Sequence, residues 1–311
     1  MNSVDASLRR ALGACCLLLT LALASFSARP LELGPQPVRA SLWAERDGVT
    51  PGQPFTLGLH LAHAPGWHSY WIVPGDSGLP TRLSWRLPPG IRAGPLQWPA
   101  PKRLPIGPLV DYGYEGDTLL LTELAAAPGL PQGGEVRIEA HAQWLMCRDV
   151  CIPASQDLAL TLAVREAAAL RPTDKAAEFD KTRERIPRDR KLPGASAART
   201  GTRITLAFAV PASGAPRRLE FFPLEPGRID PSAPQTVRVN GNTVLLELTA
   251  AQPVGADFRS LHGVLEADGG IDAGGWIGTI EVPLTARTAQ WRNSQSTVIW
   301  SQRSAFKPMG H

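Results

Sequence analysis

The amino-acid sequence predicts an all-β protein made of two β-sandwich domains joined by a short helical linker. Apolar and polar residues alternate in many short runs, and this period of two is typical of strands with one buried face. The chain of 311 residues is long enough for about two domains. Its 30 Pro and 29 Gly supply the turns that many short strands need.

The first thirty residues predict an export signal. Arg9 and Arg10 precede an apolar run from Ala11 to Ala24, and small residues follow as far as Ser27. This is the plan of a secretory signal, and its apolar core is too short to span a bilayer comfortably. We therefore expect a cleaved signal peptide over residues 1–27. The net charge of +4 is too small to indicate a nucleic-acid partner.

The rest of the chain divides by its texture. Alternation such as that of Phe55, Leu57 and Leu59 predicts strands, and we expect the first sandwich over residues 31–165. A charged, glycine-free stretch then predicts a linker over residues 166–200, with a short exposed helix from Thr173 to Arg185. Strand texture resumes in the second sandwich, residues 201–290, and a tail follows over residues 291–311.

A weak internal repeat supports two copies of one sandwich. The segments Gln97–Leu124 and Phe221–Thr249 both begin with an aromatic residue and proline, cross a proline-rich stretch and end in a threonine-led apolar strand. Only the first copy continues into a pair of cysteines. The thiols are therefore not part of a structural plan that both sandwiches need.

That pair, in the segment "WLMCRDVCIPAS", predicts a sharp turn. After removal of the signal, Cys147 and Cys151 are the only cysteines, in a compartment where disulfides persist. In a straight strand they would lie roughly 13 Å apart, whereas a disulfide needs Cα atoms within about 7 Å. A three-residue hairpin loop, 148–150, would bring them face to face, and the β-branched residues and proline that follow argue against a helix.

Three uses of the pair remain open on these residues: redox exchange, a structural disulfide and metal ligation. A loop this short would remove only about 2 kcal/mol of unfolded-state entropy, which a domain with a full core hardly needs. A tight bridge is also easier to reduce. These arguments favour redox exchange.

Other candidate sites are weaker. His60, His63, His68 and His141 could join the thiols at a copper or zinc ion, but alternation places His60 and His63 on opposite faces of a strand. The nine Trp could form carbohydrate-stacking platforms, although core packing explains them as well. The segment 76–78 has a serine without the surroundings of a hydrolase nucleophile, and "PGDSGLP" is typical of a turn.

Three segments carry a family resemblance. "APGWHSYWIVPGDSGLPTRLSW", "DYGYEGD" and "WLMCRDVCIP" together resemble the periplasmic N-terminal domain of the DsbD thiol:disulfide interchange family. They are closest to its ScsB-type branch, which has two sandwiches and is associated with copper tolerance. The resemblance covers residues 33–163 well and the second sandwich more loosely. It implies immunoglobulin-like sandwiches, a periplasmic location and a redox-active disulfide.

The resemblance also implies roles for single residues. Cys151 would form the mixed disulfide with partners and Cys147 would resolve it. A cap loop with an aromatic residue would shield the pair, while other side chains would line its pocket. The residues matching these features are Asp111, Tyr112, Gly113 and Tyr114 for the cap, and Trp67, His68, Tyr70 and Trp71 for the pocket.

As the resemblance has it, the partners would be thioredoxin-fold proteins: a membrane-linked electron donor, with a separate membrane thiol transporter, and an oxidised periplasmic acceptor. The chain would be a component of a protein-disulfide oxidoreductase system, and no cofactor is implied. Better-known members separate their cysteines by five residues instead of three, and the transmembrane and thioredoxin-like domains are missing here. A stand-alone carrier and a truncated form both fit. The alternative of another class is a non-catalytic copper-binding or scaffolding protein with a structural disulfide.

Overall fold

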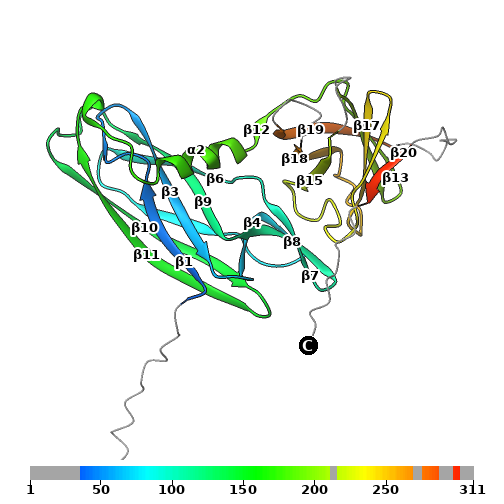
Figure 1. Cartoon of the computed structure of the whole chain (residues 1–311), viewed down its shortest axis with the longest axis horizontal. Helices are drawn as coiled ribbons and strands as arrows, with labels where there is room; N and C mark the ends of the chain where they lie inside the picture. The colour runs from blue at the N-terminus through cyan, green and yellow to red at the C-terminus, as the bar shows by residue number, and fades with distance from the viewer. Residues whose placement is uncertain (1–35, 211–215, 269–274, 287–296, 302–311) are drawn as a thin grey trace, which may run out of the picture. The chain divides into compact units, whose positions relative to one another are not determined.

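The computed structural model describes residues 36–210, 216–268, 275–286 and 297–301, and strands dominate them (Figure 1). The predicted all-β class with immunoglobulin-like sandwiches is confirmed. The predicted signal peptide lies outside the described residues. Among the described residues, no helix is long and apolar enough to cross a membrane.

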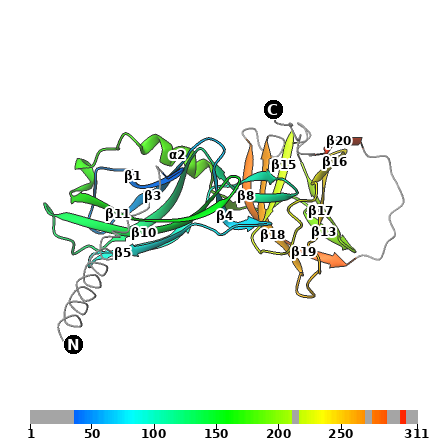
Figure 2. The same cartoon turned by 90° about the horizontal axis from the view of Figure 1, so that it is seen from below.

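The first sandwich consists of a four-stranded sheet in the order β1-β3-β9-β6 and a seven-stranded sheet in the order β2-β11-β10-β4-β8-β7, in which β5 also pairs with β10. The strands are β1 (Val38–Ala44), β2 (Gly48–Val49), β3 (Pro54–His63), β4 (His68–Gly75), β5 (Arg82–Arg86), β6 (Ile91–Gln97), β7 (Lys102–Ile106), β8 (Leu109–Glu115), β9 (Asp117–Ala126), β10 (Glu135–Cys147) and β11 (Cys151–Val164). Figure 2 shows β10 and β11 as a long ribbon along one side of this sandwich.

The core of the first sandwich forms by alternation along these strands. In β10 every second residue from Val136 to Met146 is buried, and this face packs against Leu59 and Leu120 of the other sheet within one apolar cluster. Burial of such side chains is worth roughly 1.5–3 kcal/mol each. The long ribbon is therefore fixed along its length before it reaches the cysteines.

The predicted linker contains the short helices η1 (Ala167–Ala169) and α2 (Ala176–Arg185). The predicted helix thus begins three residues later than expected, because Thr173 is tied to β1 instead: its hydroxyl donates to the carbonyl of Ala44, 2.7 Å away. The helix is also not wholly exposed. Phe179 is fully buried against Leu119 and Leu121 of β9, so one side chain anchors α2 to the first sandwich.

The second sandwich is a nine-stranded arrangement in the order β15-β18-β19-β13-β14-β17-β16-β20, in which β12 also pairs with β19. Its strands are β12 (Arg188–Asp189), β13 (Ser196–Thr200), β14 (Arg203–Ala209), β15 (Arg218–Pro223), β16 (Thr236–Asn240), β17 (Thr243–Thr249), β18 (Ser260–Asp268), β19 (Trp276–Ala286) and β20 (Thr297–Ser301). The sheet thus takes β13 from the segment expected as linker and β20 from the segment expected as tail.

The internal repeat does not extend to strand pairing. In the second sandwich, β16 and β17 form an antiparallel hairpin around Gly241. The corresponding strands β8 and β9 of the first sandwich lie in different sheets, so the chain crosses between layers at Gly116. A glycine with positive φ serves both turns, which explains the similar sequence without a common topology.

Candidate redox site

The two cysteines close the end of the β10–β11 ribbon. Thirteen residue pairs run in unbroken register from Glu135 opposite Ala163 to Cys147 opposite Cys151. The three residues between the cysteines form the loop, the Cα atoms lie 4.2 Å apart, and the sulfurs form a disulfide. The predicted hairpin is therefore confirmed.

The two cysteines differ in their access to solvent. Cys147 is only 2% exposed, whereas Cys151 is exposed at the start of β11. Cys147 pairs with His68 of β4, so a neighbouring strand covers it. An incoming thiolate must approach a disulfide in line with the bond that breaks. Of the two cysteines, Cys151 is therefore the more accessible to an incoming thiolate.

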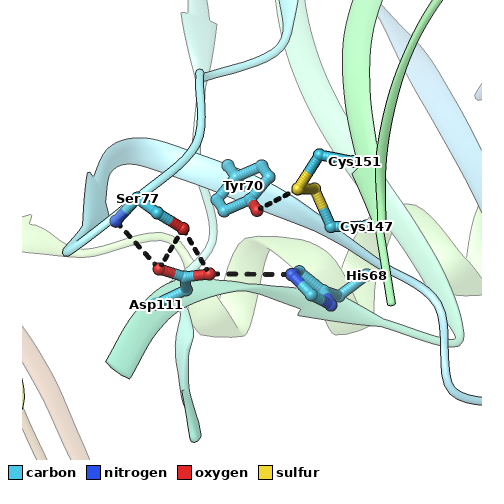
Figure 3. The surroundings of a disulfide bond; sticks show 6 residues. All are labelled: His68, Tyr70, Ser77, Asp111, Cys147 and Cys151. Atoms are coloured by element: carbon cyan, nitrogen blue, oxygen red, sulfur yellow. Dashed lines mark hydrogen bonds and ion pairs between the residues drawn. A yellow bond between two sulfur atoms is a disulfide. The ribbon is translucent and has the colours of Figure 1, made fainter. Parts of the chain in front are cut away.

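Tyr70 contacts the exposed cysteine. Its hydroxyl lies 3.6 Å from the sulfur of Cys151 (Figure 3). A disulfide sulfur has no proton, so the tyrosine is the donor in this contact. Burial, with the charge of Asp111 as a smaller cause, raises the pKa of Tyr70 to about 12. The hydroxyl therefore keeps its proton at physiological pH and can donate to the sulfur before and during exchange.

The loop after β4 holds the ring of Tyr70 in place. Gly78 has a φ of +92°, and a Cβ on it would lie 2.1 Å from Cε1 of Tyr70, so the backbone rests directly on the ring. The neighbouring residue ties this loop to β8, because the backbone amide and hydroxyl of Ser77 both donate to Asp111 at 3.0 Å. On the other side, the carboxylate of Asp76 accepts from the amide of Val110 at 2.8 Å.

A buried histidine and aspartate lie beneath the disulfide. Nε2 of His68 is 3.8 Å from Oδ2 of Asp111, and the side chains are 3% and 1% exposed. They meet because Gly113, which lies between Asp111 and Glu115 on this face of β8, has no side chain. A Cβ on Gly113 would lie 2.1 Å from the carbonyl oxygen of Ser69, so the close pairing of β4 and β8 requires glycine here.

The predicted cap loop is wrong. The residues expected to form it, Asp111 to Tyr114, lie in strand β8, where alternation turns both tyrosines into the core. Tyr112 is fully buried with its ring 5.3 Å from that of Phe222, and the hydroxyl of Tyr114 donates to the carbonyl of Pro99 at 2.7 Å. Neither can cover the cysteines. The tyrosine that contacts the disulfide is Tyr70, at Cys151.

The predicted pocket residues divide between two places. His68 and Tyr70 share one face of β4 and lie at the disulfide, with their rings 5.3 Å apart. Trp67 lies beside the hairpin, where the guanidinium of Arg148 stands 5.2 Å from the centre of its ring. Trp71 points to the opposite face and is buried in the core. The segment "PGDSGLP", predicted as a turn, also supports the ring of Tyr70 through Gly78, which its sequence did not indicate.

Exposed apolar side chains lie next to site residues along the sequence. The large apolar residues that are exposed in the described part of the chain are Ile72, Leu79, Leu109 and Val150. Each lies within two residues of Tyr70, Gly78, Asp111 or Cys151, respectively. Exposed apolar groups gathered at one site indicate a surface that contacts another molecule.

Of the four histidines considered as metal ligands, His68 lies beside the disulfide and the other three form hydrogen bonds to other residues. His60 bonds Asp117, His63 bonds Ser69, and His141 bonds Asp157, each at 2.8 Å. Throughout the ranges described above, no three His, Cys, Asp or Glu side chains are grouped closely enough to hold a metal ion.

Comparison with known proteins assigns the first sandwich. Residues 40–163 match the family model described as thiol:disulfide interchange protein DsbD, N-terminal. This segment is similar to the N-terminal domain of DsbD. The matched residues include both members of the Cys147–Cys151 disulfide. No curated protein sequence matches the chain.

A solved structure extends the similarity of fold beyond the DsbD-type domain. The N-terminal periplasmic domain of ScsB from Proteus mirabilis has a TM-score of 0.56 and 15% identity, and the match covers 79% of this chain and 92% of that one. A titin I-band fragment, I67–I69, reaches a TM-score of only 0.20 at 12% identity, with 81% and 66% covered. The periplasmic chaperone SfaE reaches 0.22 at 11% identity, with 80% and 100% covered. The last two are too dissimilar to carry an argument.

Proposed function

We propose that this chain is a periplasmic electron carrier that exchanges thiols and disulfides with other proteins through Cys147 and Cys151. The observation that carries the proposal is the unequal exposure of the pair, since Cys151 is exposed and Cys147 is buried. A purely structural disulfide would need neither an exposed sulfur nor an apolar surface around it.

The donor reduces the pair in two displacement steps, and the pair reduces the acceptor in two more. A thiolate of the electron donor attacks the sulfur of Cys151, the bond to Cys147 breaks, and Cys147 takes the electron pair. A second donor thiol then displaces Cys151, which leaves the donor oxidised and this chain as a dithiol. Electrons pass on when a thiolate of Cys151 attacks the disulfide of an acceptor, and Cys147 then attacks Cys151 and releases the acceptor reduced.

The surroundings of the pair suit partners of the thioredoxin fold. Ile72, Leu79 and Val150 offer an apolar contact surface beside Cys151, and transient redox complexes need only a small one. The donor would be membrane-linked, with a separate thiol transporter, and the acceptor an oxidised periplasmic protein. In this role the chain is a protein-disulfide oxidoreductase component.

Trapping tests the proposal. Without its resolving cysteine, Cys147→Ala should accumulate mixed disulfides with a thioredoxin-fold protein, seen as a mass shift that dithiothreitol reverses. Cys151→Ala is the matched control and should trap far less, because its remaining sulfur is covered. Absence of trapping in both variants, together with copper binding by the reduced protein, would support the non-catalytic alternative.

A further inference from the structure

A buried histidine, His68, lies beneath the disulfide. His68 lies directly opposite Cys147 on the neighbouring strand. Side chains in this position share a face of the sheet, with Cβ atoms about 4.5–5.5 Å apart. Figure 3 shows the imidazole between Cys147 and the carboxylate of Asp111. The imidazole of His68 thus lies between the sulfur of Cys147 and the carboxylate of Asp111.

The histidine and aspartate are not a satisfied structural pair. Nε2 of His68 is buried, has no hydrogen-bond partner and faces Oδ2 of Asp111 at 3.8 Å. By contrast, both carboxylate oxygens of Asp111 accept hydrogen bonds from Ser77. A buried polar group without a partner costs stability, so its presence beside a reactive bond calls for a chemical reason.

The chemistry of the leaving sulfur supplies that reason. When a thiolate attacks Cys151, Cys147 leaves with a negative charge in a site that is 2% exposed. Burial disfavours a thiolate, so the charge must be neutralised where it forms. An imidazolium at His68 can give its proton to Cys147, which leaves a neutral thiol and a neutral imidazole. In the return step, the imidazole takes the proton back as Cys147 becomes the attacking thiolate.

We propose that His68, oriented by Asp111, is the proton donor and acceptor of Cys147 during disulfide exchange. This inference rests on the proposed function. Asp111 is a positioning residue, since its carboxylate faces Nε2 of the imidazole at 3.8 Å. The charged and titratable groups that surround His68 are Asp111 and Glu115 on β8, Tyr70 on β4, Cys147 and Arg148 at the hairpin, and His63 on β3.

The rate at which dithiothreitol reduces the pair, measured across pH, tests the inference without any protein partner. The ratio of variant to wild-type rate cancels the ionisation of dithiothreitol itself. His68→Gln should lower the neutral-pH rate on the order of a hundredfold and remove the inflection due to the imidazole. Asp111→Asn should move that inflection to lower pH. His141→Gln, a matched exposed histidine on β10, should change neither.

A second measurement needs no variant to fold. The imidazole of His68 is identified by NMR through its contact with the ring of Tyr70, and its pKa is measured in the oxidised and reduced wild-type protein. The inference expects different values in the two states. Equal values, or an inflection that persists in His68→Gln, would overturn it. Failure of partner trapping with an intact histidine inflection would instead overturn only the proposed function.

Discussion

At the scale of single residues, the hydroxyl of Tyr70 contacts the disulfide, whereas that of Tyr114 contacts only the protein core. Its hydroxyl donates to Cys151, whereas that of Tyr114 donates to a backbone carbonyl in the core. Both tyrosines are buried enough to keep their protons, and burial raises the pKa of each. The chain therefore contains two comparable tyrosine hydroxyls with different partners.

We expect Tyr70→Phe to slow reduction of the pair by dithiothreitol about fivefold to tenfold at neutral pH, the equivalent of one hydrogen bond of about 1 kcal/mol. The loss arises because the hydroxyl no longer donates to the sulfur that dithiothreitol attacks. The matched variant Tyr114→Phe should lower the free energy of unfolding by about 1 kcal/mol and leave the rate unchanged. Equal rates in both variants would show that Tyr70 only shields the sulfur.

At the scale of elements, the loop after β4 holds the ring of Tyr70 beside the disulfide. It is tied to β8 through Ser77 and places the backbone of Gly78 on the Tyr70 ring. A Cβ at this position has no room, since the nearest ring atom would be 2.1 Å away. The position of the Tyr70 ring therefore depends on glycine at position 78. The next residue, Leu79, is exposed.

We expect Gly78→Ala to displace Tyr70, lower the free energy of unfolding by more than about 2 kcal/mol and speed alkylation of the reduced Cys151. Gly107→Ala is the control, because Gly107 also has a positive φ, +58°, but a Cβ added to it would meet no atom within 4 Å. It should cost only about 1 kcal/mol and leave alkylation unchanged. Urea unfolding and mass-detected alkylation measure the two effects.

Sequence reasoning predicted the parts of the site that depend on local geometry. The spacing of Cys147 and Cys151 permits few conformations, so the hairpin between them could be predicted. The direction of Tyr112 could not, because "DYGYEGD" fits a loop as well as a strand until its neighbours are known. Only the pairing of β8 with β4 and β7 decides which face enters the core.

The same limit applies to the linker. Its helix was predicted from composition, but β13 was not, because a short strand gains its stability from neighbours distant in sequence. Ala197 pairs with Leu206 of β14 and Leu284 of β19. Such tertiary pairing can override local propensity, and residues 196–200 by themselves do not predict a strand.

At the scale of the whole molecule, the tyrosines are distributed unevenly. All three of them, Tyr70, Tyr112 and Tyr114, belong to the first sandwich, and burial raises the pKa of each. The second sandwich has a core cluster of its own, centred on residues such as Phe208, Phe221 and Leu246, with no tyrosine in it. High pH therefore acts on one domain through these groups.

We expect the first sandwich to lose stability selectively above about pH 10. An unfolded tyrosine releases its proton near that pH, while the folded ones retain theirs, so the unfolded state binds fewer protons and the free energy of unfolding falls as pH rises. For Tyr70 the fall spans the interval from about 10 to about 12. Thermal unfolding between neutral and alkaline pH should separate into two transitions, of which the earlier coincides with tyrosine ionisation. A single transition that shifts as a unit would contradict this expectation.

The length of the β10–β11 ribbon has a consequence for how such a carrier can change over evolutionary time. Its chemistry occupies only the last of thirteen pairs, and the inward-facing residues that hold it to the body lie further back. Lengthening or shortening the connection between the sulfurs leaves every earlier pair in place. The loop between the cysteines can therefore differ between related chains while the strands that carry it stay the same.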